Sequence, residues 1–416
     1  MISTLKKVLK KLAIFTIKKY QPGVIIITGS VGKTSTKEAI YTLLRNVRRV
    51  RSASGNFNNE LGVPLTILGP WTEIKGIFFW PKVIFYAVFN LIFSKQYPEI
   101  LILEYAADKP GDIRYLLEIA KPQISIVTAV GEIPVHVEFY PNPDAVAEEK
   151  SKIIEALLPI GLGILNFDDE TVMEMKEKTR ARIITFGFKE GADVRVSDLE
   201  NQSEELINGF HKPVGITFKL EYAGNFAHIK LDGVFGKAQA YAIAAAACVG
   251  VSFGLQLTRI TEEMQYYQAP KRRLKLLAGV KGSFILDDSY NASPLSMRAT
   301  IDTVKDLKSK RKIGVLGDML ELGPYSMEAH EEIGYLARKV FDILITIGPR
   351  AKLIADGAIL NGFDKSKVFS FDNAEQAKIE TQNIIQKGDL ILVKGSNSMQ
   401  LDKIVEEIRH RVAPIV

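Results

Sequence analysis

Cysteine and histidine are scarce in this chain, whose 416 residues include one cysteine and five histidines. The single cysteine, Cys248, excludes an internal disulfide framework and a metal site built from several thiolates, and it fits a reducing compartment. It lies in the alanine-rich run from Ala244 to Val249, which is typical of a buried helix. With so few histidines, a zinc site made of several imidazoles is not expected either.

Long hydrophobic runs are also missing. The most apolar stretch, from Ile77 to Phe93, is interrupted by Pro81, Lys82 and Asn90 and falls short of the ~20 residues of a comfortable membrane-spanning helix. A transmembrane helix is therefore not expected here. The stretch is either a buried helix or an exposed patch that rests on a membrane or a partner.

Acidic residues are absent from the first twenty positions, which carry six lysines. Apolar residues at helical spacing are interleaved with lysines in this leader: Leu5, Val8, Leu9 and Leu12 with Lys6, Lys7, Lys10 and Lys11. The pattern predicts a basic amphipathic helix over residues 1–20. It lacks the long apolar core and the cleavage site of a secretory signal. The helix either lies on an anionic membrane surface or packs on the protein body with its lysines in solvent.

What the chain does have is hydrophobic (47%) and charged (25%) residues in the proportions of a globular protein. Apolar runs that predict strands recur at residues 24–27, 100–103, 124–127, 163–165, 283–286, 312–316, 343–347 and 390–393. Helical patterns separate many of them, at residues 33–44, 141–158, 236–249, 296–307 and 327–340. Strands that alternate with helices predict an α/β fold with parallel, doubly wound sheets.

The strongest local signal is a phosphate-binding loop between a strand and a helix, Gly29-Ser30-Val31-Gly32-Lys33-Thr34-Ser35. Its glycines let backbone N–H groups approach phosphate, and the N-terminus of the helix favours anions. Lys33 is placed to reach the outer phosphates of ATP, and the Thr34 hydroxyl to bind Mg²⁺. The loop has the shortened form Gly-x-x-Gly-Lys-Thr, because Ile27 stands where the full motif has glycine.

The strand pattern restarts near residue 269, after a polar section at residues 193–230 that predicts a small antiparallel sheet. We therefore expect three parts. They are the basic amphipathic leader helix (1–20), a P-loop-type central ATPase domain (21–268) and a C-terminal Rossmann-like doubly wound domain (269–416).

Polar side chains follow several other predicted strands. Glu104 follows the strand at 100–103, where open α/β sheets bind ligands and a carboxylate can complete a magnesium site. Other candidates stand in short segments: Gly55 to Thr66, His136 and Glu138, Glu148-Glu149-Lys150, Asp287 to Pro294, Leu316 to Gly323 before His330, and Val393 to Ser396. Helix caps for Glu104 and Asp288, and a solvated surface position for Lys150, are simpler alternatives.

In this order and spacing, the segments resemble the Mur ligase family from about Val24 to Ile408. The Asp-Asp-Ser-Tyr-Asn-Ala, Leu-Gly-Asp-Met-x-Glu-Leu-Gly and Lys-Gly-Ser motifs are most similar to the members that add D-alanyl-D-alanine to a cell-wall precursor. The resemblance implies an ATP- and Mg²⁺-dependent ligase that phosphorylates a substrate carboxylate and lets an amine displace the phosphate. Its partners would be a cell-wall precursor peptide and D-alanyl-D-alanine or another amine, and no nucleic acid. Its place would be the cytoplasm, with peripheral contact at the inner membrane face as a further expectation.

The resemblance also implies roles for individual residues. Gly29 to Ser35 would hold the triphosphate. Asn166, which opens an Asn-x-Asp-Asp turn, would contact the nucleotide from the central domain, and Asp288 and Asn291 from the C-terminal domain. The magnesium ligands would be Thr34, Glu104, His136 and Lys150, the lysine as a carbamate. The catalytic residues would be Lys33, His136, Lys150 and Arg273, and the substrate contacts Asn58, Asn59, Lys394 and Ser396.

The sequence departs from the family pattern at three places. Only 28 residues precede Gly29, so we expect the domain that grips the uridine nucleotide to be missing. The segment Gly236-Lys237-Ala238-Gln239 predicts an altered adenine contact, and Asn397 stands where an arginine is expected. An amide ligase acting on a pseudomurein-like or polyglutamate-like precursor is therefore an alternative. A non-catalytic nucleotide-binding scaffold at a membrane is a weaker one, since it would not need a complete metal site.

Overall fold

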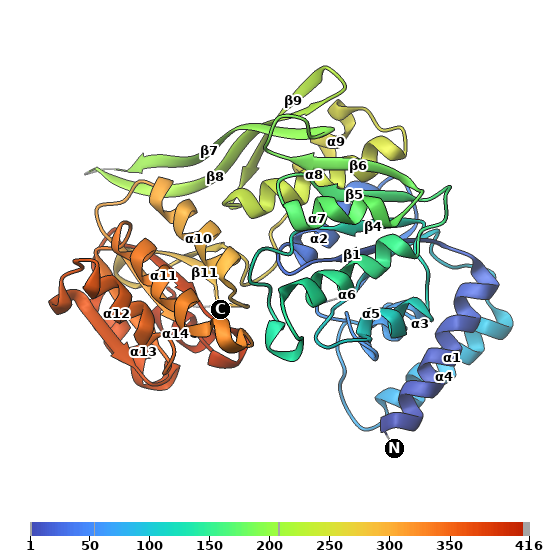
Figure 1. Ribbon diagram of the computed structural model, residues 1–416, viewed down its shortest axis with the longest axis horizontal. Coiled ribbons are helices and arrows are strands. Elements are labelled where there is room, and N and C mark those ends of the chain that lie inside the picture. Colours follow the sequence, from blue (N-terminus) through green and yellow to red (C-terminus); the bar gives the residue numbers. More distant parts are fainter. Residues whose placement is uncertain (1, 54, 207–208, 411–416) are drawn as a thin grey trace, which may run out of the picture.

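The computed structural model describes residues 2–53, 55–206 and 209–410 and is drawn in Figure 1. Met1 of the predicted leader and residues 411–416 of the predicted C-terminal domain lie outside the described part. The chain forms two α/β units, each built around its own sheet. No described helix is long and apolar enough to cross a membrane.

The first sheet has nine strands in the order β2-β3-β1-β4-β5-β6-β7-β8-β9, parallel from β2 to β7 and antiparallel from β7 to β9. Their bounds are β1 (Gly23–Thr28), β2 (Val50–Ser52), β3 (Ile100–Glu104), β4 (Ile124–Val127), β5 (Leu162–Asn166), β6 (Arg182–Gly187), β7 (Val194–Leu206), β8 (Phe210–Tyr222) and β9 (Asn225–Asp232). The predicted antiparallel section at residues 193–230 is thus an extension of the parallel sheet.

The second sheet has six strands in the order β10-β11-β15-β12-β13-β14, of which only the edge strand β10 is antiparallel to its neighbour. Their bounds are β10 (Lys275–Ala278), β11 (Phe284–Asp288), β12 (Lys312–Gly317), β13 (Ile343–Ile347), β14 (Val368–Phe371) and β15 (Leu390–Lys394). The prediction of an α/β fold with parallel, doubly wound sheets is confirmed. The division of the chain at residues 268 and 269 stays a prediction.

Helices cover both sheets. Those of the first unit are α1 (Ile2–Tyr20), α2 (Lys33–Leu44), α3 (Gly62–Leu68), α4 (Phe79–Phe93), α5 (Asp112–Leu117), α6 (Pro143–Glu155), α7 (Glu170–Glu174), α8 (Lys237–Ser252) and α9 (Leu257–Met264). Those of the second are α10 (Pro294–Asp306), α11 (Ser326–Arg338), α12 (Lys352–Leu360), α13 (Ala374–Ile384) and α14 (Asp402–Ile408).

Alternate side chains of β1 explain why this strand is apolar throughout. Ile25 and Ile27 pack in the cluster formed by α2, α8 and α9 on one face of the sheet. Val24 and Ile26 pack in the cluster formed by α1, α3, α4, α5 and α6 on the other. A strand buried on both faces has no polar positions, and this pattern made the central strands visible in the sequence.

The leader helix α1 packs on the protein body, which was one of the two alternatives. Its apolar side, including the fully buried Leu9, faces the cluster of α3, α4 and α5. Lys6 forms an ion pair with Glu60 (2.5 Å) and Lys10 with Glu118 (2.5 Å). Two of the four lysines expected in solvent are therefore held by acidic residues of the body.

The two units also touch through a long hairpin. In Figure 1, β7 and β8 extend from the first sheet toward the second unit. At the start of β8, the Lys310 ammonium of the second unit lies 4.4 Å from the centroid of the Phe210 ring. The carboxyl ends of β1 and β3 and those of β11 and β15 bring their following loops to the boundary between the units.

Candidate active site

The phosphate loop runs from β1 to α2 and lies against the residues that follow β4. Gly29 has a φ of 144°, and a Cβ there would lie 2.1 Å from the Thr128 hydroxyl, so this position requires glycine. The Ser30 N–H donates to the Ala129 carbonyl (2.6 Å). The Ser30 hydroxyl is buried and has no hydrogen-bond partner among the described residues, as expected of a group that awaits a ligand oxygen.

Lys33 begins α2 directly after Gly32, whose left-handed φ of 92° turns the chain into the helix. The Lys33 ammonium donates to the Gly29 carbonyl of its own loop (2.7 Å). Burial lowers the pKa of Lys33, and the nearby Glu104 carboxylate opposes this shift. The free N–H groups of the helix start and this lysine make the loop a site for a polyphosphate.

Glu104 is the last residue of β3 and is almost fully buried. One carboxylate oxygen lies 3.1 Å from the Thr34 hydroxyl, and the other lies 3.1 Å from the Asn58 side-chain nitrogen. These contacts exclude the helix-cap alternative. Two oxygen ligands at this spacing, from a carboxylate and a hydroxyl, suit Mg²⁺.

Lys150 lies on α6, whose N-terminus is capped by the Asn142 side chain. It is only 1% exposed, which excludes the surface-lysine alternative. Burial, and next the charge of Lys33, lower the pKa of Lys150 to about 7. Much of this amine is therefore uncharged near neutral pH, and the uncharged amine is the form that reacts with CO₂ to give a carbamate and a proton.

His136 stands at the boundary between the two units. Its Nε2 lies 3.3 Å from the Asp108 carboxylate, and its Nδ1 lies 2.5 Å from the Glu321 carboxylate. The second contact is close, but it is not aligned as a hydrogen bond. Because Glu321 comes from the Leu316–Gly323 segment of the second unit, the imidazole is in contact with both units.

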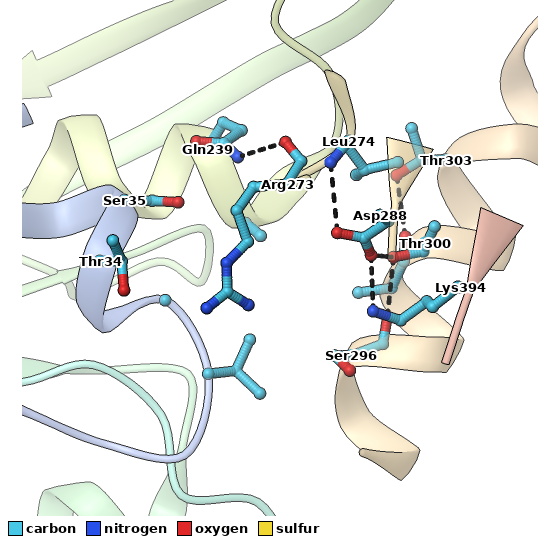
Figure 2. Close-up of a pocket in the computed structure, with 14 residues that line it drawn as sticks. Thr34, Ser35, Gln239, Arg273, Leu274, Asp288, Ser296, Thr300, Thr303 and Lys394 are labelled. Carbon is cyan, nitrogen blue, oxygen red and sulfur yellow. Dashed lines mark hydrogen bonds and ion pairs between the residues drawn. The ribbon is translucent and has the colours of Figure 1, made fainter. Parts of the chain in front are cut away.

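In the second unit, Asp288 and Lys394 form a buried ion pair at the ends of neighbouring parallel strands (Figure 2). The Lys394 ammonium donates to Asp288 (2.6 Å) and to the Asn291 carbonyl (3.0 Å). Asp288 also accepts from the Leu274 N–H (3.2 Å) and the Thr300 hydroxyl (2.9 Å). Asp288 is thus held by three donors and caps no helix.

Arg273 projects between this ion pair and the start of α2 (Figure 2). Its guanidinium lies 4.1 Å from the centroid of the Tyr290 ring. Its backbone carbonyl accepts from the Gln239 side chain (3.4 Å), which in turn accepts from the Tyr267 hydroxyl (2.6 Å). Gln239, in the segment predicted to alter the adenine contact, is therefore nearly buried and fixes Arg273 instead.

A cavity of 620 Å³ continues from the phosphate loop along α8. The rings of Phe186 and Tyr241 are among its walls, and Asn166 lines it from the end of β5. The Tyr241 hydroxyl donates to Asp168 (2.6 Å), and the Asp168 N–H donates to Asn166 (3.0 Å). Aromatic walls with a few fixed polar groups suit a nucleoside.

Most of the predicted residues meet in a second cavity, of 210 Å³, between the units. The predicted residues that line it are Ser30, Val31, Gly32, Lys33, Thr34, Asn58, Glu104, His136, Lys150, Arg273 and Asn291. Ser35, Asp288 and Lys394 line a smaller adjoining pocket of 50 Å³ together with Arg273. The convergence is a finding of the structure, because these residues are far apart in the sequence.

Two predicted substrate contacts lie outside the linings of these cavities. The Asn59 side chain accepts from the N–H groups of Leu61 and Gly62, so it shapes the start of α3. The Ser396 hydroxyl accepts from the Leu320 N–H (2.9 Å), so it holds the Leu316–Gly323 segment. Both side chains are thus engaged with backbone N–H groups of the protein.

Several residues of the site escaped the sequence reasoning, including Glu321, whose carboxylate contacts His136. Asp108 and Tyr290 line the 210 Å³ cavity, and Tyr241 lines the nucleoside cavity. Asp108 and Tyr290 stood inside segments that had been noticed, so their place directly after a strand was the available signal. Tyr241 stands inside a helix of mostly small apolar residues, where nothing distinguishes it from a core residue.

The residues present fit ATP and Mg²⁺. The partnerless Ser30 hydroxyl, the glycine cradle and the Lys33 ammonium match a polyphosphate, and Thr34 and Glu104 offer oxygen ligands. In the described part of the chain, no group of three or more His, Cys, Asp or Glu side chains is placed so that it could hold a metal ion. A magnesium site here would therefore draw on the Thr34 hydroxyl and on a carbamate at Lys150 in addition to acidic side chains.

Comparison with known sequences matches two family profiles to this chain. The Mur ligase middle domain matches residues 27–75 and 86–250, and the glutamate ligase domain of Mur ligases matches residues 272–397. The UDP-N-acetylmuramoyl-tripeptide–D-alanyl-D-alanine ligase of Bacillus subtilis (strain 168) is 30% identical over 402 residues, which are 96% of this chain and 79% of that protein. The ligase of the same name from Synechocystis is 30% identical over 390 residues, which are 92% of this chain and 74% of that protein.

Solved structures agree. MurF from Acinetobacter baumannii superposes with a TM-score of 0.78 at 25% identity, covering 97% of this chain and 80% of that one. MurF ligase from Thermotoga maritima in complex with ADP superposes with a TM-score of 0.77 at 29% identity, covering 97% of this chain and 83% of that one. The family resemblance of the motifs is thereby confirmed, and the chain belongs to the Mur ligase family of ATP-dependent, peptide-bond-forming enzymes.

Proposed function

We propose that this enzyme adds D-alanyl-D-alanine to a UDP-N-acetylmuramoyl-tripeptide and couples the reaction to cleavage of ATP to ADP and phosphate. One observation carries the proposal. A phosphate loop, a strand-end carboxylate and a buried lysine from the first unit face an arginine from the second across one cavity. Relatives that share this arrangement of domains and about 30% of the residues carry the corresponding name.

The reaction needs two displacements. A carboxylate oxygen of the acceptor attacks the γ-phosphorus of ATP, an O–P bond forms, and ADP leaves. The amine nitrogen of the dipeptide then attacks the acyl carbon, a C–N bond forms, and inorganic phosphate leaves with the acyl oxygen while the nitrogen loses a proton. Bringing a carboxylate to a triphosphate opposes like charges, so positive groups at the phosphates lower the barrier.

The first unit supplies those positive groups. Lys33 and the N–H groups of Gly29 to Ser35 would bind the β- and γ-phosphates. Thr34, Glu104, His136 and a carbamoylated Lys150 would hold Mg²⁺, and the ion would offset the negative charge of the phosphoryl group. The pKa of about 7 for Lys150 supports a carbamate. A positively charged lysine would instead repel the metal.

The second unit would close the site. Arg273 lines the same pockets as the phosphate loop and would approach the phosphates from the boundary, and Asp288 and Asn291 would contact the nucleotide from the far wall. Lys394 holds both of these through its two hydrogen bonds. Closure would exclude water from the acyl phosphate, which hydrolyses readily. Among the predicted substrate contacts, Asn58 lines the cavity, whereas Asn59 and Ser396 would act by positioning the loops around it.

A panel of acceptors and amines tests this function directly. Purified enzyme is given ATP, Mg²⁺ and each pair of a muramoyl-tripeptide nucleotide or another acceptor with D-alanyl-D-alanine, D-alanine or L-glutamate. Phosphate release and product mass are measured together. We expect both only with the muramoyl tripeptide and D-alanyl-D-alanine. Asn397, where the family pattern has arginine, favours a different amine as the second candidate, and preferred turnover of such a pair would establish it.

We propose further that the enzyme works in the cytoplasm in peripheral contact with the inner face of the membrane. The support comes from α1, on which Lys7, Lys11 and Lys18 remain exposed and have no ion-pair partner among the described residues. Cations in a stripe attract anionic lipid, by ~1 kcal/mol for each lysine near the surface.

A further inference from the structure

The structure leaves a large apolar face uncovered on α4. Side chains along this helix and the turn before it are exposed: Ile77 (86%), Phe78 (80%), Phe85 (73%), Phe89 (50%), Ile92 (64%) and Phe93 (68%). Contiguous apolar surface of this kind marks a site of interaction rather than ordinary surface. We infer that α4, flanked by the exposed lysines of α1, is the surface with which this enzyme docks onto an anionic lipid bilayer.

Helical geometry gathers these side chains on one side. Phe78, Phe85 and Phe89 are separated by seven and four positions, which places them on a single stripe. The buried residues of the helix, Phe79, Val83 and Ala87, form the opposite stripe at four-residue spacing. The helix therefore uses one side to attach to the body and offers the other to solvent.

The aromatic rings on the exposed side contact each other. The centroids of Phe85 and Phe89 lie 6.3 Å apart, and those of Phe89 and Phe93 lie 5.0 Å apart. They form a continuous ridge along the helix instead of isolated exposed rings. Aromatic side chains on one face of a helix that lies in the plane of a bilayer enter the boundary between headgroups and acyl chains.

The leader helix α1 is hydrogen-bonded to α4, the helix that carries this ridge. In Figure 1, α1 and α4 lie side by side and project from one edge of the first unit. The Lys19 ammonium donates to the carbonyls of Leu91 (2.8 Å) and Ser94 (2.8 Å), and the Tyr20 hydroxyl donates to that of Asn90 (2.7 Å). These bonds satisfy carbonyls at the open end of α4 and fix the two helices together.

The apolar side of the leader was expected to suit a membrane, but α1 uses that side to pack on the body. Its lysines remain available in a stripe, because Lys7, Lys11 and Lys18 are spaced by four and seven positions on the side away from Leu9. The two requirements of an interfacial helix are thus divided between two helices. The leader supplies cations, and α4 supplies apolar side chains.

The charges around this face favour an anionic bilayer over a second copy of the chain as its partner. Lys75, before α4, pairs with Glu73 (2.7 Å). Acidic residues are absent between Glu73 and Glu99, whereas Lys82 and Lys95 are present. A second copy of the chain docked through the same face would bring these lysines toward the lysines of its partner. An anionic bilayer pairs the cations with phosphate headgroups and covers the phenylalanine ridge with acyl chains.

The stretches that match the family profile leave out part of this surface. The matched profile of the middle domain stops at residue 75 and resumes at residue 86, so the beginning of α4 lies between the matched stretches. All of α1 precedes the match. The cavity of the active site lies at the boundary with the second unit, away from the edge at which α1 and α4 project (Figure 1), so docking leaves it open.

Flotation with lipid vesicles tests the inference, which builds on the proposed work at the inner membrane face. The full-length protein is mixed with vesicles of phosphatidylcholine alone or with phosphatidylglycerol. We expect binding to the anionic vesicles and loss of it at high salt. The double variant Phe85→Ser/Phe89→Ser should bind about tenfold or more weakly, because two large apolar side chains no longer enter the bilayer. Lys7→Glu/Lys11→Glu should lower the affinity by about fivefold or more for each lysine.

Matched controls make the outcome decisive. Ile160→Ser/Leu360→Ser removes two apolar side chains outside α4 that are more exposed than Phe85 and Phe89, and it should float like the unchanged protein. Melting temperature and ligation without vesicles should be the same in all variants. Equal flotation of the α4 variant and the unchanged protein overturns the inference. So does failure to bind any vesicle, or an α4-dependent dimer in sedimentation. Flotation without ligation leaves docking intact and counts against the proposed ligase function.

Discussion

At the scale of single residues, the positions proposed to bind phosphate and metal were the most visible in the sequence. Gly29, Gly32 and Lys33 could be found because a strand-to-helix turn around phosphate needs two glycines and a lysine at fixed spacing. Glu321 and Tyr241 could not be assigned roles, because their neighbours in the site come from residues more than 70 positions away. Contacts of that kind follow from the packing of the units and leave no local pattern.

Lys33 provides the first prediction. Replacing Lys33 with alanine should lower kcat by about 10²-fold or more, since the phosphates lose a buried cation that stabilises the transition state. Steady-state phosphate release measures the effect, and circular dichroism checks the fold. Lys121→Ala, at an exposed position between α5 and β4, is the control and should retain full activity. Near-normal turnover of the Lys33 variant with an intact fold would remove the phosphate loop from the mechanism.

Lys150 provides the second prediction. Lys150→Ala should be inactive, and short carboxylates such as formate or acetate should restore part of the activity, because they replace the oxygen ligands of a carbamate. Lys152→Ala is a matched control on the same helix, where the partly exposed Lys152 pairs with the buried Glu149 (2.5 Å). That variant should be active and indifferent to added carboxylate. A fully active Lys150 variant would contradict the proposed role.

At the scale of elements, the sequence predicted the buried parallel strands except β6 (Arg182–Gly187), and it missed the short edge strands. Runs such as Ile100–Glu104 are apolar throughout because both faces of the sheet are covered. β2 (Val50–Ser52) and β14 (Val368–Phe371) are short, lie at the edges and are partly exposed, so their sequences lack that pattern. For α4 the sequence left two alternatives, and the structure shows the exposed one.

The Leu316–Gly323 segment gives a prediction at this scale through His330 on α11. The buried imidazole accepts from the Met319 N–H (2.9 Å), and its Nδ1 lies 2.6 Å from the Ser326 carbonyl, so it is held in its neutral form. Burial lowers the pKa of His330 below its ordinary value of 6.5. Below pH 6.5 the unfolded chain binds a proton that the folded protein resists, and the free energy of unfolding should fall.

Urea unfolding of the protein and of His330→Ala at pH 7.5 and pH 5.5 measures this. At pH 7.5 the variant should lose about 1–3 kcal/mol, because the Met319 N–H stays buried without an acceptor. The free energy of unfolding of the variant should also depend less on pH than that of the unchanged protein. Identical pH dependence of the two proteins would show that His330 does not couple protonation to folding.

At the scale of the whole molecule, the walls of the active site come from both units. Residues of α2 and α10 line the same pocket, so a nucleotide bound there would contact both units at once. A ligand at a hundred times its Kd stabilises the folded state by about 2.7 kcal/mol. Mg²⁺ with a non-hydrolysable ATP analogue should therefore raise the melting temperature and slow hydrogen exchange in α2 and α10 together. Protection confined to the first unit would contradict a shared site.

The most direct test of the central claim follows the oxygen atoms. If the acceptor carboxylate attacks ATP and the amine then displaces phosphate, one carboxylate oxygen must leave with the phosphate. An acceptor labelled with ¹⁸O in its terminal carboxylate is incubated with ATP, Mg²⁺ and D-alanyl-D-alanine, and the released phosphate is analysed by mass spectrometry. The account predicts one ¹⁸O in each phosphate formed, and almost no phosphate when the amine is left out. Unlabelled phosphate, released at the same rate without the amine, would contradict it.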